Sequence, residues 1–520
     1  MKRWATNLFL ALFLMGTAGC ATVGGDPRDP LEGFNRAMYS FNDGFDAAVG
    51  KPVATVYRDA IPAPARMMVR NFFANIADLW IGGNNLLQGK PLDALTDWTR
   101  FAVNSVFGVF GLLDFASDMG IEKHDEDFGQ TFGRWGIDDG GYLVWPLLGP
   151  STVRDSLGTL VDIYVDPVLA HKPIRVRNTM AVLRATSKRA DLLDASRILE
   201  EAALDKYVFQ RDAYLQRRRS LVYDGNPPRA EREAPSRAEA PAPEAEPTQS
   251  VSHPRNRPRP CCPHCCRRPT QALRAPPLLR WKRRCACSSS RRPPPPPEAR
   301  MSRMFARLAA ATAALVLAGG IGMRNALAQD VAPDVLVKTV TQEVVDIIQK
   351  DKDIQAGDRK KVIALIEAKV LPHFNFQSMT ASAVGRNWDK ATPDQKARLM
   401  DEFKTLLVRT YSSALSAYSS QKLDFRPLRA KPTDTDVTVN VRVMQSGSQP
   451  VTIDYDMEKR PTGWKVWDVR VGGISLVANY RTEFDNQVRE AGIEGLIKTL
   501  VTKNRSLERG PTVAAPAEKK

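Results

Sequence analysis

The chain has 520 residues, which is more than one hydrophobic core holds, so two to four domains are expected. Its formal net charge is +16, but residues 251–300 alone carry twelve Arg, one Lys and one Glu, which amounts to +12. Only +4 remains for the other 470 residues, which disfavours a nucleic-acid binder with a basic face. Six of the seven Cys lie between 261 and 287, so the two long globular stretches contain no disulfide framework.

A secretory signal opens the chain at residues 1–20. Lys2 and Arg3 precede a short apolar run, and small residues lead to Cys20. This ending resembles a bacterial lipoprotein signal, in which the Cys is lipidated and becomes the mature N-terminus. Ala21 after it favours the outer membrane by the sorting rule of such lipoproteins. We predict Cys20 as the lipid attachment residue; the alternative is an ordinary secretory signal with an incidental Cys.

A second signal-like segment occupies residues 301–328. Met301 is followed by Arg303 and Arg307, then by an apolar run, and Ala326–Ala328 has the A-x-A form of a cleavage site. An internal Met that starts a complete secretory signal suggests that it was the start of a separate protein.

Residues 226–300 are a predicted linker. Pro, Ala and Glu dominate 226–250, and Pro, Arg and Cys dominate 251–300. Three interpretations stay open for the second stretch: a zinc site on Cys262-x-x-Cys265 with His264, a disordered linker, or an out-of-frame junction between neighbouring genes. We favour the junction and predict no metal site.

Residues 21–225 form the first predicted module, with a helical pattern almost throughout. The first helix is predicted over Leu31–Phe45, where four apolar residues recur on one face: Phe34, Met38, Phe41 and Phe45. The uncharged segment Phe101–Leu113 is too short to cross a bilayer, so it is either core or a segment that dips into one leaflet. Periodicity alone favours core.

Five motifs of this module resemble the VacJ/MlaA family of outer-membrane lipoproteins. They are Asp29–Arg36, Asn84–Gly89, Glu126–Thr131, Tyr142–Asp155 and Tyr207–Tyr214. The resemblance implies an all-α, ring-like module embedded in the inner leaflet of the outer membrane, around an amphipathic channel. Phospholipids misplaced in the outer leaflet would drain through this channel toward the periplasm. Within this module, Gly140–Pro150 is either a pore edge or membrane contact, or an ordinary buried loop.

Residues 329–510 form the second predicted module, with an α+β arrangement, and 511–520 a disordered tail. Helices come first, and one carries an apolar face at Leu336, Val340, Val344, Ile347 and Ile348. Thr392–Gln395 reads as a capping box that starts a further helix. Alternating apolar residues at 437–443 and 451–457, then a turn at Pro461–Gly463, predict an antiparallel sheet whose apolar face is covered by helices.

The segments Trp464–Val469 and Gly473–Arg481, followed by Phe484, resemble the MlaC family of periplasmic phospholipid carriers. The family implies a pocket between sheet and helices that holds the acyl tails and leaves the headgroup outside. Candidate lining residues are Phe403, Leu407, Tyr411, Leu476, Val477 and Tyr480, for which plain core packing is an equally open role. Asn479 and Arg481 are expected to be structural or surface groups rather than headgroup ligands.

These features predict intermembrane phospholipid trafficking that maintains outer-membrane lipid asymmetry. The first module would act at the periplasmic face of the outer membrane and the second in the periplasm. We expect no enzyme activity and no cofactor, with phospholipid as the transported ligand. By resemblance, partners are an outer-membrane porin and an inner-membrane transport complex, and no nucleic acid is expected. A passive lipoprotein scaffold and a lipid hydrolase are the alternatives; the chain lacks G-x-S-x-G and H-E-x-x-H motifs.

Overall fold

The computed structural model describes residues 26–228, 331–356, 358–416, 422–428, 430–431, 433–444 and 450–509. They belong to one compact unit, which we divide into an N-module (residues 26–228) and a C-module (residues 331–509). The two predicted signals with Cys20, the linker with its Cys-rich stretch, and the tail 511–520 lie outside the described residues.

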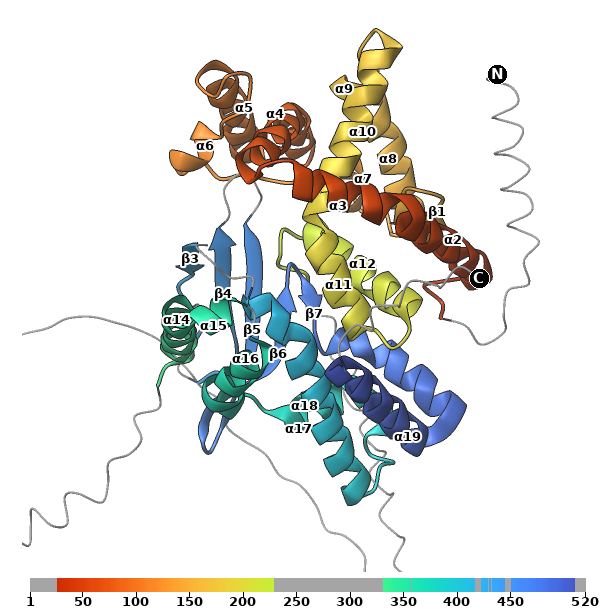
Figure 1. Ribbon diagram of the computed structural model, residues 1–520, viewed down its shortest axis with the longest axis vertical. Coiled ribbons are helices and arrows are strands. Elements are labelled where there is room, and N and C mark those ends of the chain that lie inside the picture. Colours follow the sequence, from red (N-terminus) through yellow and green to blue (C-terminus); the bar gives the residue numbers. More distant parts are fainter. Residues whose placement is uncertain are drawn as a thin grey trace, which may run out of the picture. The chain divides into compact units, whose positions relative to one another are not determined.

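The N-module is helical with one short hairpin (Figure 1). Its helical elements are α2 (Glu32–Phe45), the π-helix η1 (Asp46–Gly50), α3 (Lys51–Ala60), α4 (Ala63–Leu87), α5 (Pro91–Val106), α6 (Phe115–Asp118), α7 (Phe128–Arg134), α8 (Val153–Val165), α9 (Pro167–Ala170), α10 (Ile174–Asp191), α11 (Leu193–Ala202) and α12 (Lys206–Val222). The hairpin pairs β1 (Tyr142–Trp145) with β2 (Gly149–Thr152) in antiparallel register. The helical prediction is confirmed, and the stretch Gly140–Pro150 contributes both strands of the hairpin.

Buried ion pairs join elements of the N-module that are far apart in sequence. The Arg218 guanidinium donates to Asp127 at 2.6 Å and to Asp155 at 2.9 Å. Burial alone would raise the pKa of both carboxyls, but Arg218 holds each below its usual value. Asn35 of α2 donates to the Asp29 carboxylate at 2.8 Å and accepts the Val144 N–H. The sequence motifs therefore meet inside the module and fix its packing.

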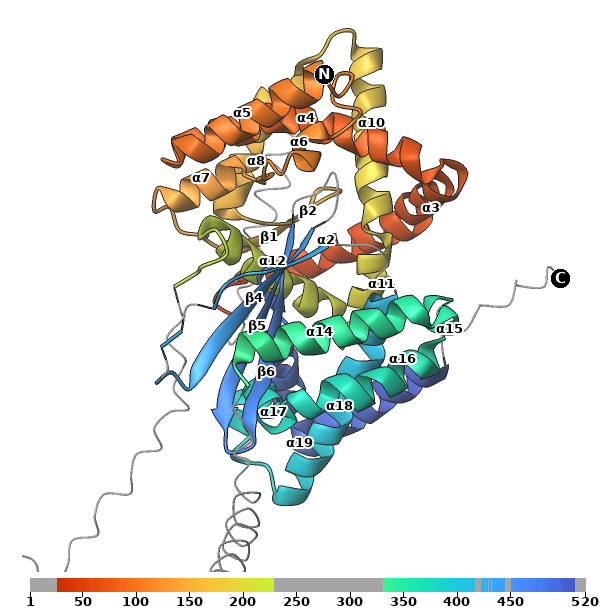
Figure 2. The ribbon, with the colours of Figure 1, turned by 90° about the vertical axis from the view of Figure 1, so that its left-hand side faces the viewer.

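The C-module is a five-stranded antiparallel sheet packed against helices (Figure 2). The strands are β3 (Lys422–Phe425), β4 (Asp436–Met444), β5 (Val451–Arg460), β6 (Gly463–Val471) and β7 (Ile474–Ser475), and they neighbour one another in chain order. The helical elements are α14 (Pro333–Lys350), α15 (Lys352–Gln355), α16 (Arg359–Leu365), η2 (Ile366–Val370), η3 (Leu371–His373), α17 (Phe376–Val384), η4 (Gly385–Asn387), α18 (Pro393–Ser416) and α19 (Ala478–Arg509). This is the predicted α+β arrangement.

Local sequence signals place the ends and bends of these elements. The capping box is confirmed: the Gln395 N–H donates to Thr392 Oγ1 at 3.3 Å, and the Thr392 N–H donates to Gln395 Oε1 at 3.0 Å. Gly492 interrupts α19 with φ 71° and ψ −179°, a backbone conformation that only glycine adopts readily. The helix therefore has two arms, and both contribute to the same core.

Apolar clusters hold the C-module together. One lies between α17, α18 and α19, and includes Leu399, Phe403, Leu406, Phe484 and Leu500. A second joins α14 to the sheet and includes Val337, Val437, Val439, Val441, Met457, Val466 and Val469. Three of the alternating valines, Val437, Val439 and Val441, are buried in this cluster, which confirms the predicted apolar face of that strand.

Candidate functional site

Helices α4 and α5 bury polar side chains and expose apolar ones. The buried polar residues lie three, four or seven positions apart, on one side of each helix: Asn71, Asn75, Asp78 and Asn85 on α4, and Asp97, Arg100 and Asn104 on α5. The exposed residues include Met67, Met68, Leu79, Leu86, Leu92, Leu95 and Val106. A protein surrounded by water shows the opposite distribution, so this face of the N-module suits an apolar surrounding.

The loop after α5 is the most exposed apolar part of this surface. Phe107 is 69% exposed and Phe110 is 78% exposed. Val109 and Phe110 have φ angles of 52° and 59°, a left-handed conformation that costs L-residues free energy. The core interpretation of Phe101–Leu113 is therefore wrong for its C-terminal half. The physical reason is that α5 turns Asn104 inward, so its apolar residues are left outside.

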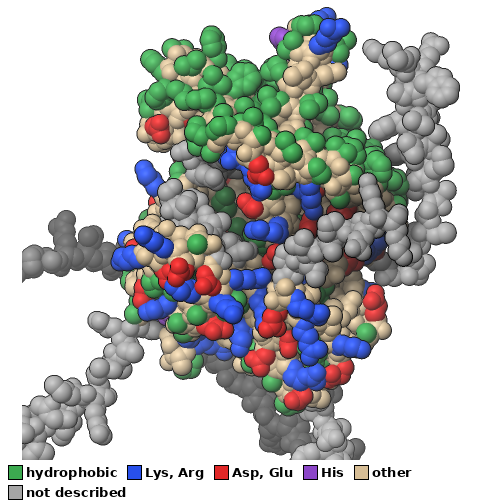
Figure 3. Space-filling view, viewed as in Figure 1, with side chains coloured by type: hydrophobic (Ala, Val, Ile, Leu, Met, Phe, Trp, Pro, Cys, Tyr) green, Lys and Arg blue, Asp and Glu red, His purple; other side chains and the backbone are tan. Residues whose placement is uncertain are grey.

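A similar reversal occurs on α2. The apolar face predicted from Phe34, Met38, Phe41 and Phe45 exists, but Phe41 and Phe45 are exposed and Asn35 is buried. Figure 3 shows hydrophobic side chains gathered over the N-module, whereas Lys, Arg, Asp and Glu gather over the C-module. None of the described helices is both long and apolar enough to cross a bilayer.

The predicted lining residues of the C-module lie in two of its apolar clusters. Phe403, Leu407, Val477 and Tyr480 are buried together between α18 and α19, with Tyr411 partly buried against them. The sixth predicted lining residue, Leu476, packs on the sheet-side cluster instead. Aromatic contacts order the first group: the Tyr480 ring meets the Phe403 ring edge-on at 5.2 Å and the Phe484 ring at 5.5 Å.

The same cluster continues into the N-module. Ala202 and Ala203 end α11, Phe209 lies in the first turn of α12, and all three are buried in it. The Phe209 ring lies edge-on to Tyr480 at 5.4 Å, and the Tyr480 hydroxyl donates to the Ala202 carbonyl at 3.3 Å. We call residues 199–216, which include the turn between α11 and α12, the corner. One apolar core therefore spans the corner and the C-module.

Two charged side chains of α19 bind the backbone ends of the corner. The Glu483 carboxylate accepts the N–H of Asp205 at 2.8 Å and that of Leu204 at 3.4 Å, where α12 begins. The Lys503 ammonium donates to the carbonyl oxygens of Ala203 at 2.8 Å and Glu200 at 3.2 Å, where α11 ends. The Lys503 ammonium has the sign that complements the C-terminal end of α11. Burial raises the pKa of Glu483 to about 8.

Amide groups complete this contact. Gln216 of α12 accepts the Ser475 N–H at 3.0 Å and donates to Asn479 Oδ1 at 3.1 Å. The Ser475 hydroxyl donates to the buried Asp468 carboxylate, whose pKa burial raises to about 7. Asn479 is thus a contact residue between modules. Arg481 is exposed and donates to the Ser382 carbonyl at 3.1 Å.

Comparisons with known proteins assign the N-module. The sequence model of the MlaA lipoprotein family matches residues 27–221. The intermembrane phospholipid transport system lipoprotein MlaA of Escherichia coli is 35% identical over 229 residues, which cover 42% of this chain and 90% of that protein. The chain belongs to the MlaA family. The MlaA of Haemophilus influenzae is 31% identical, with 91% of its length covered.

The C-module matches a second family. The sequence model of the MlaC protein family covers residues 338–502, so the chain is an MlaA–MlaC fusion. A phospholipid-binding protein from Ralstonia solanacearum, solved with a phospholipid, is 38% identical with a TM-score of 0.32, covering 34% of this chain and 98% of that one. This protein is also similar, over a share longer than the C-module, to a chain from a structure on maintenance of bacterial outer membrane lipid asymmetry, which is 33% identical with a TM-score of 0.34, covering 38% of this protein and 99% of that chain.

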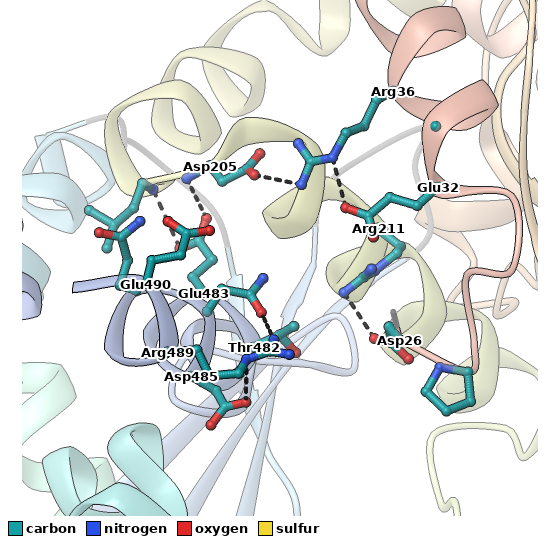
Figure 4. A pocket seen from close by; sticks show the side chains of 15 residues that line it. Asp26, Glu32, Arg36, Asp205, Arg211, Thr482, Glu483, Asp485, Arg489 and Glu490 are labelled. Carbon is teal, nitrogen blue, oxygen red and sulfur yellow. Dashed lines mark hydrogen bonds and ion pairs between the residues drawn. The ribbon is translucent and has the colours of Figure 1, made fainter. Parts of the chain in front are cut away.

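A polar cavity of about 840 Å³ lies beside the contact between the MlaA and MlaC parts (Figure 4). Carboxylates and guanidinium groups line it, among them Asp26, Glu32, Arg36, Asp205, Arg211, Glu483, Asp485, Arg489 and Glu490. Several are already paired: Arg36 donates to Glu32 at 2.8 Å and to Asp205 at 2.9 Å. Burying acyl chains against these charges would cost free energy, so the cavity does not suit lipid tails.

Metal sites and unpredicted contact residues remain to be described for this MlaA–MlaC chain. Across residues 26–228 and the described parts of 331–509, no cluster of His, Cys, Asp and Glu could hold a metal ion. The zinc hypothesis concerns residues outside those ranges. Sequence reasoning missed Phe209, Gln216, Glu483 and Lys503, although the first two lie in or beside the quoted MlaA motif Tyr207–Tyr214. Their shared role depends on contacts between segments far apart in the chain.

Proposed function

We propose that this chain moves phospholipids between the outer membrane and the periplasm and so maintains outer-membrane lipid asymmetry. The observation that carries the proposal is the reversed burial of α4 and α5, whose polar residues face inward and whose apolar residues face outward. Such a surface is stable in contact with acyl chains. The N-module would therefore embed in one leaflet, in a ring-like arrangement around a lipid path. Membership of the MlaA family supports this location.

The C-module is the proposed carrier. Each lipid CH₂ group that enters water costs about 0.8 kcal/mol, so two long chains cost on the order of 20 kcal/mol. A lipid therefore crosses an aqueous compartment only inside an apolar cavity. The C-module offers apolar clusters on both the helix side and the sheet side, and it matches the MlaC family. We propose that Phe403, Leu407, Tyr411, Leu476, Val477 and Tyr480 contact the acyl tails.

The partners and anchoring follow from the same proposal. Cys20 would carry the lipid that holds the N-module at the periplasmic face of the outer membrane. An outer-membrane porin would surround or adjoin the N-module, and an inner-membrane transport complex would exchange lipid with the C-module. Both partners are proposed from the family relationship alone, and phospholipid is the only ligand that the proposal needs.

A transporter is favoured over a lipid hydrolase by the surroundings of His124. Its Nδ1 atom lies 2.9 Å from the Asp97 carboxylate, which also accepts a hydrogen bond from Asn85 at 2.8 Å. This arrangement joins α4, α5 and the loop between α6 and α7. The other ring nitrogen, Nε2, lies 4.0 Å from the Asp93 carboxylate, and no hydrogen bond from a described Ser or Thr hydroxyl reaches it as a nucleophile would. The His124–Asp97 pair thus supplies hydrogen-bond partners to polar groups inside the N-module.

Site-specific photo-crosslinking tests the carrier. A benzophenone side chain replaces Tyr411, which is partly buried in the cluster between α18 and α19. The matched control places it at Lys404 of the same helix, whose side chain is 38% exposed and lies outside the cluster. The full chain is inserted into phosphatidylethanolamine–phosphatidylglycerol vesicles with ³²P-labelled lipid and irradiated. Covalent ³²P capture at position 411 but not at 404 is expected, whereas no capture at 411, or equal capture at both, rejects the carrier function.

A further inference from the structure

The corner of the N-module occupies one end of the core that the C-module would use for lipid. Phe209, Ala202 and Ala203 are buried in the same cluster as Phe403 and Tyr480. Tyr480 is fully buried: it meets Phe209 on one side and Phe403 on another, while its hydroxyl reaches the Ala202 carbonyl. The corner therefore completes the packing around a residue proposed to line the lipid site.

Close packing leaves little freedom at this point. Protein interiors are packed as densely as organic crystals, so acyl chains enter only where side chains move aside. Phe403, Tyr480 and Leu496 are fully buried in the contact state. For tails to pass between α18 and α19, the Tyr480 ring must shift, and this shift breaks its contact with Phe209 and its hydrogen bond to Ala202.

Hydrogen bonds surround the apolar cluster and give the contact one defined geometry, which apolar packing alone would not. Glu483 accepts two backbone N–H groups at the start of α12, and Lys503 donates to two carbonyl oxygens at the end of α11. Gln216 links Ser475 to Asn479 from the other module. Asn479, Tyr480 and Glu483 lie within about one turn of α19. Movement of Tyr480 therefore also disturbs the hydrogen bonds that Asn479 and Glu483 make to the corner.

We propose that the corner and the acyl chains compete for the core of the C-module, so that the empty carrier holds the N-module and the loaded carrier releases it. This inference rests on the proposed carrier function. Because coupling between two binding events is reciprocal, lipid weakens the contact and the contact weakens lipid binding by the same factor. The carrier would thereby remain at the membrane surface until a lipid enters it.

The test loosens the contact in two ways, once through its polar bonds and once through its apolar cluster. Lys503→Ala removes the bonds to the corner carbonyls, and Lys498→Ala, an exposed position on the same helix, is the matched control. Phe209→Ala is a second, apolar variant. Each is made in the full chain with the benzophenone at Tyr411, in phosphatidylethanolamine–phosphatidylglycerol vesicles at sub-saturating ³²P-labelled lipid. Hydrogen exchange of the Leu204 and Asp205 amides reports whether the contact has loosened.

Both contact variants should raise ³²P capture by about fivefold or more, the lower end of typical coupling between sites. The Lys498→Ala control should match the parent chain. Capture that stays unchanged or falls while the Leu204 and Asp205 amides exchange faster overturns the competition, even though capture at Tyr411 still supports the carrier. Absence of capture in every variant rejects the carrier and the competition together.

Discussion

The Glu483 carboxylate accepts the backbone N–H of Asp205 at 2.8 Å, although the two residues are 278 positions apart in the chain. Burial raises the pKa of Glu483 to about 8, and the Asp205 and Asp212 carboxylates add to the rise, against the N–H groups of Leu204 and Asp205 that lower it. Burial lowers the pKa of the nearby Lys503, and the Glu483 carboxylate offsets part of this shift. The contact between modules is therefore linked to protonation.

The sign of this linkage follows from the direction of the shift. The Glu483 carboxyl binds its proton more tightly in the contact than in water, where its pKa is about 4.3. Its contribution is thus fully present below that value and is lost as the pH rises through about 8. Asp468, with a pKa raised to about 7 by burial, bonds groups of the C-module alone, so its titration acts with the same sign on the stability of that module.

We therefore expect the contact to weaken between pH 5 and pH 9. Hydrogen exchange at Leu204 and Asp205, corrected for the intrinsic dependence of exchange on pH, measures this change. Glu483→Gln should flatten the profile, because the substituted side chain does not titrate. Equal corrected protection at both ends of the range would contradict the linkage.

Arg218 should be essential for the stability of the N-module. Its guanidinium pairs with Asp127 and with the buried Asp155, so Arg218→Met leaves Asp127 without its cation, while Asp155 keeps only Arg154 as an ionic partner. Removing one partner of a buried ion pair typically costs about 3–5 kcal/mol of unfolding free energy. Denaturant unfolding of the full chain in detergent measures this loss. Arg219→Ala, an exposed neighbour, should change the value by less than about 0.5 kcal/mol, and a similarly small effect at Arg218 would refute the argument.

The apolar loop after α5 should bind membranes by itself. In a Cys20→Ser background, which removes the predicted lipid anchor, Phe110→Glu replaces an exposed ring by a charge. Burial of a Phe side chain is worth about 1.5–3 kcal/mol, so vesicle binding should fall about tenfold or more in a flotation assay. Gln349→Glu adds the same charge to the C-module and should leave flotation unchanged. Equal flotation of the two variants would show that the loop does not enter lipid.

Leu407→Trp should block the acyl chains. The Leu407 side chain lies in the cluster between α18 and α19. The indole ring that replaces it fills space that the acyl chains would need, and such overpacking costs about 1–3 kcal/mol of unfolding free energy. Lipid capture at Tyr411 should then fall, whereas Lys404→Trp, at a position of α18 outside the cluster, should leave it unchanged. A thermal melt confirms that each variant is folded. If Leu407→Trp folds and captures lipid fully, Leu407 does not line the pocket.

The C-module could be predicted well because its signals are local. The Thr392–Gln395 capping box, the alternating valines of β4 and the turn at Pro461–Gly463 all form as the sequence indicates. Each depends on neighbours within a few residues or on one adjacent strand. The capping residues and the strand register therefore follow from propensity and periodicity alone.

For the N-module, local signals predicted the helices but did not show which of their faces is exposed. Periodicity identifies an apolar face but does not say which solvent that face meets, so the segment that contains Phe110 is interpreted as core although Phe110 is exposed. The missed signal is the opposite stripe: Asn71, Asn75, Asp78 and Asn85 recur at helical spacing on α4. A repeated stripe of Asn and Asp opposite Met and Leu indicates a polar interior.

The contact residues could not be predicted from sequence. Lys503 and Glu200 are 303 positions apart, and neither forms a motif with its neighbours. The resemblance to two families indicated the two folds but not the residues through which one meets the other. Long-range pairing depends on the tertiary arrangement of α11, α12 and α19, which no local pattern encodes.

The bonds from α19 to the corner join segments of a single chain. For two separate polypeptides, this encounter would be second-order, and dilution in the periplasm would dissociate the pair. Within one chain it is a first-order rearrangement whose equilibrium does not depend on protein abundance. Expression level then sets how many transport units the cell has, while the fraction of units in contact stays constant.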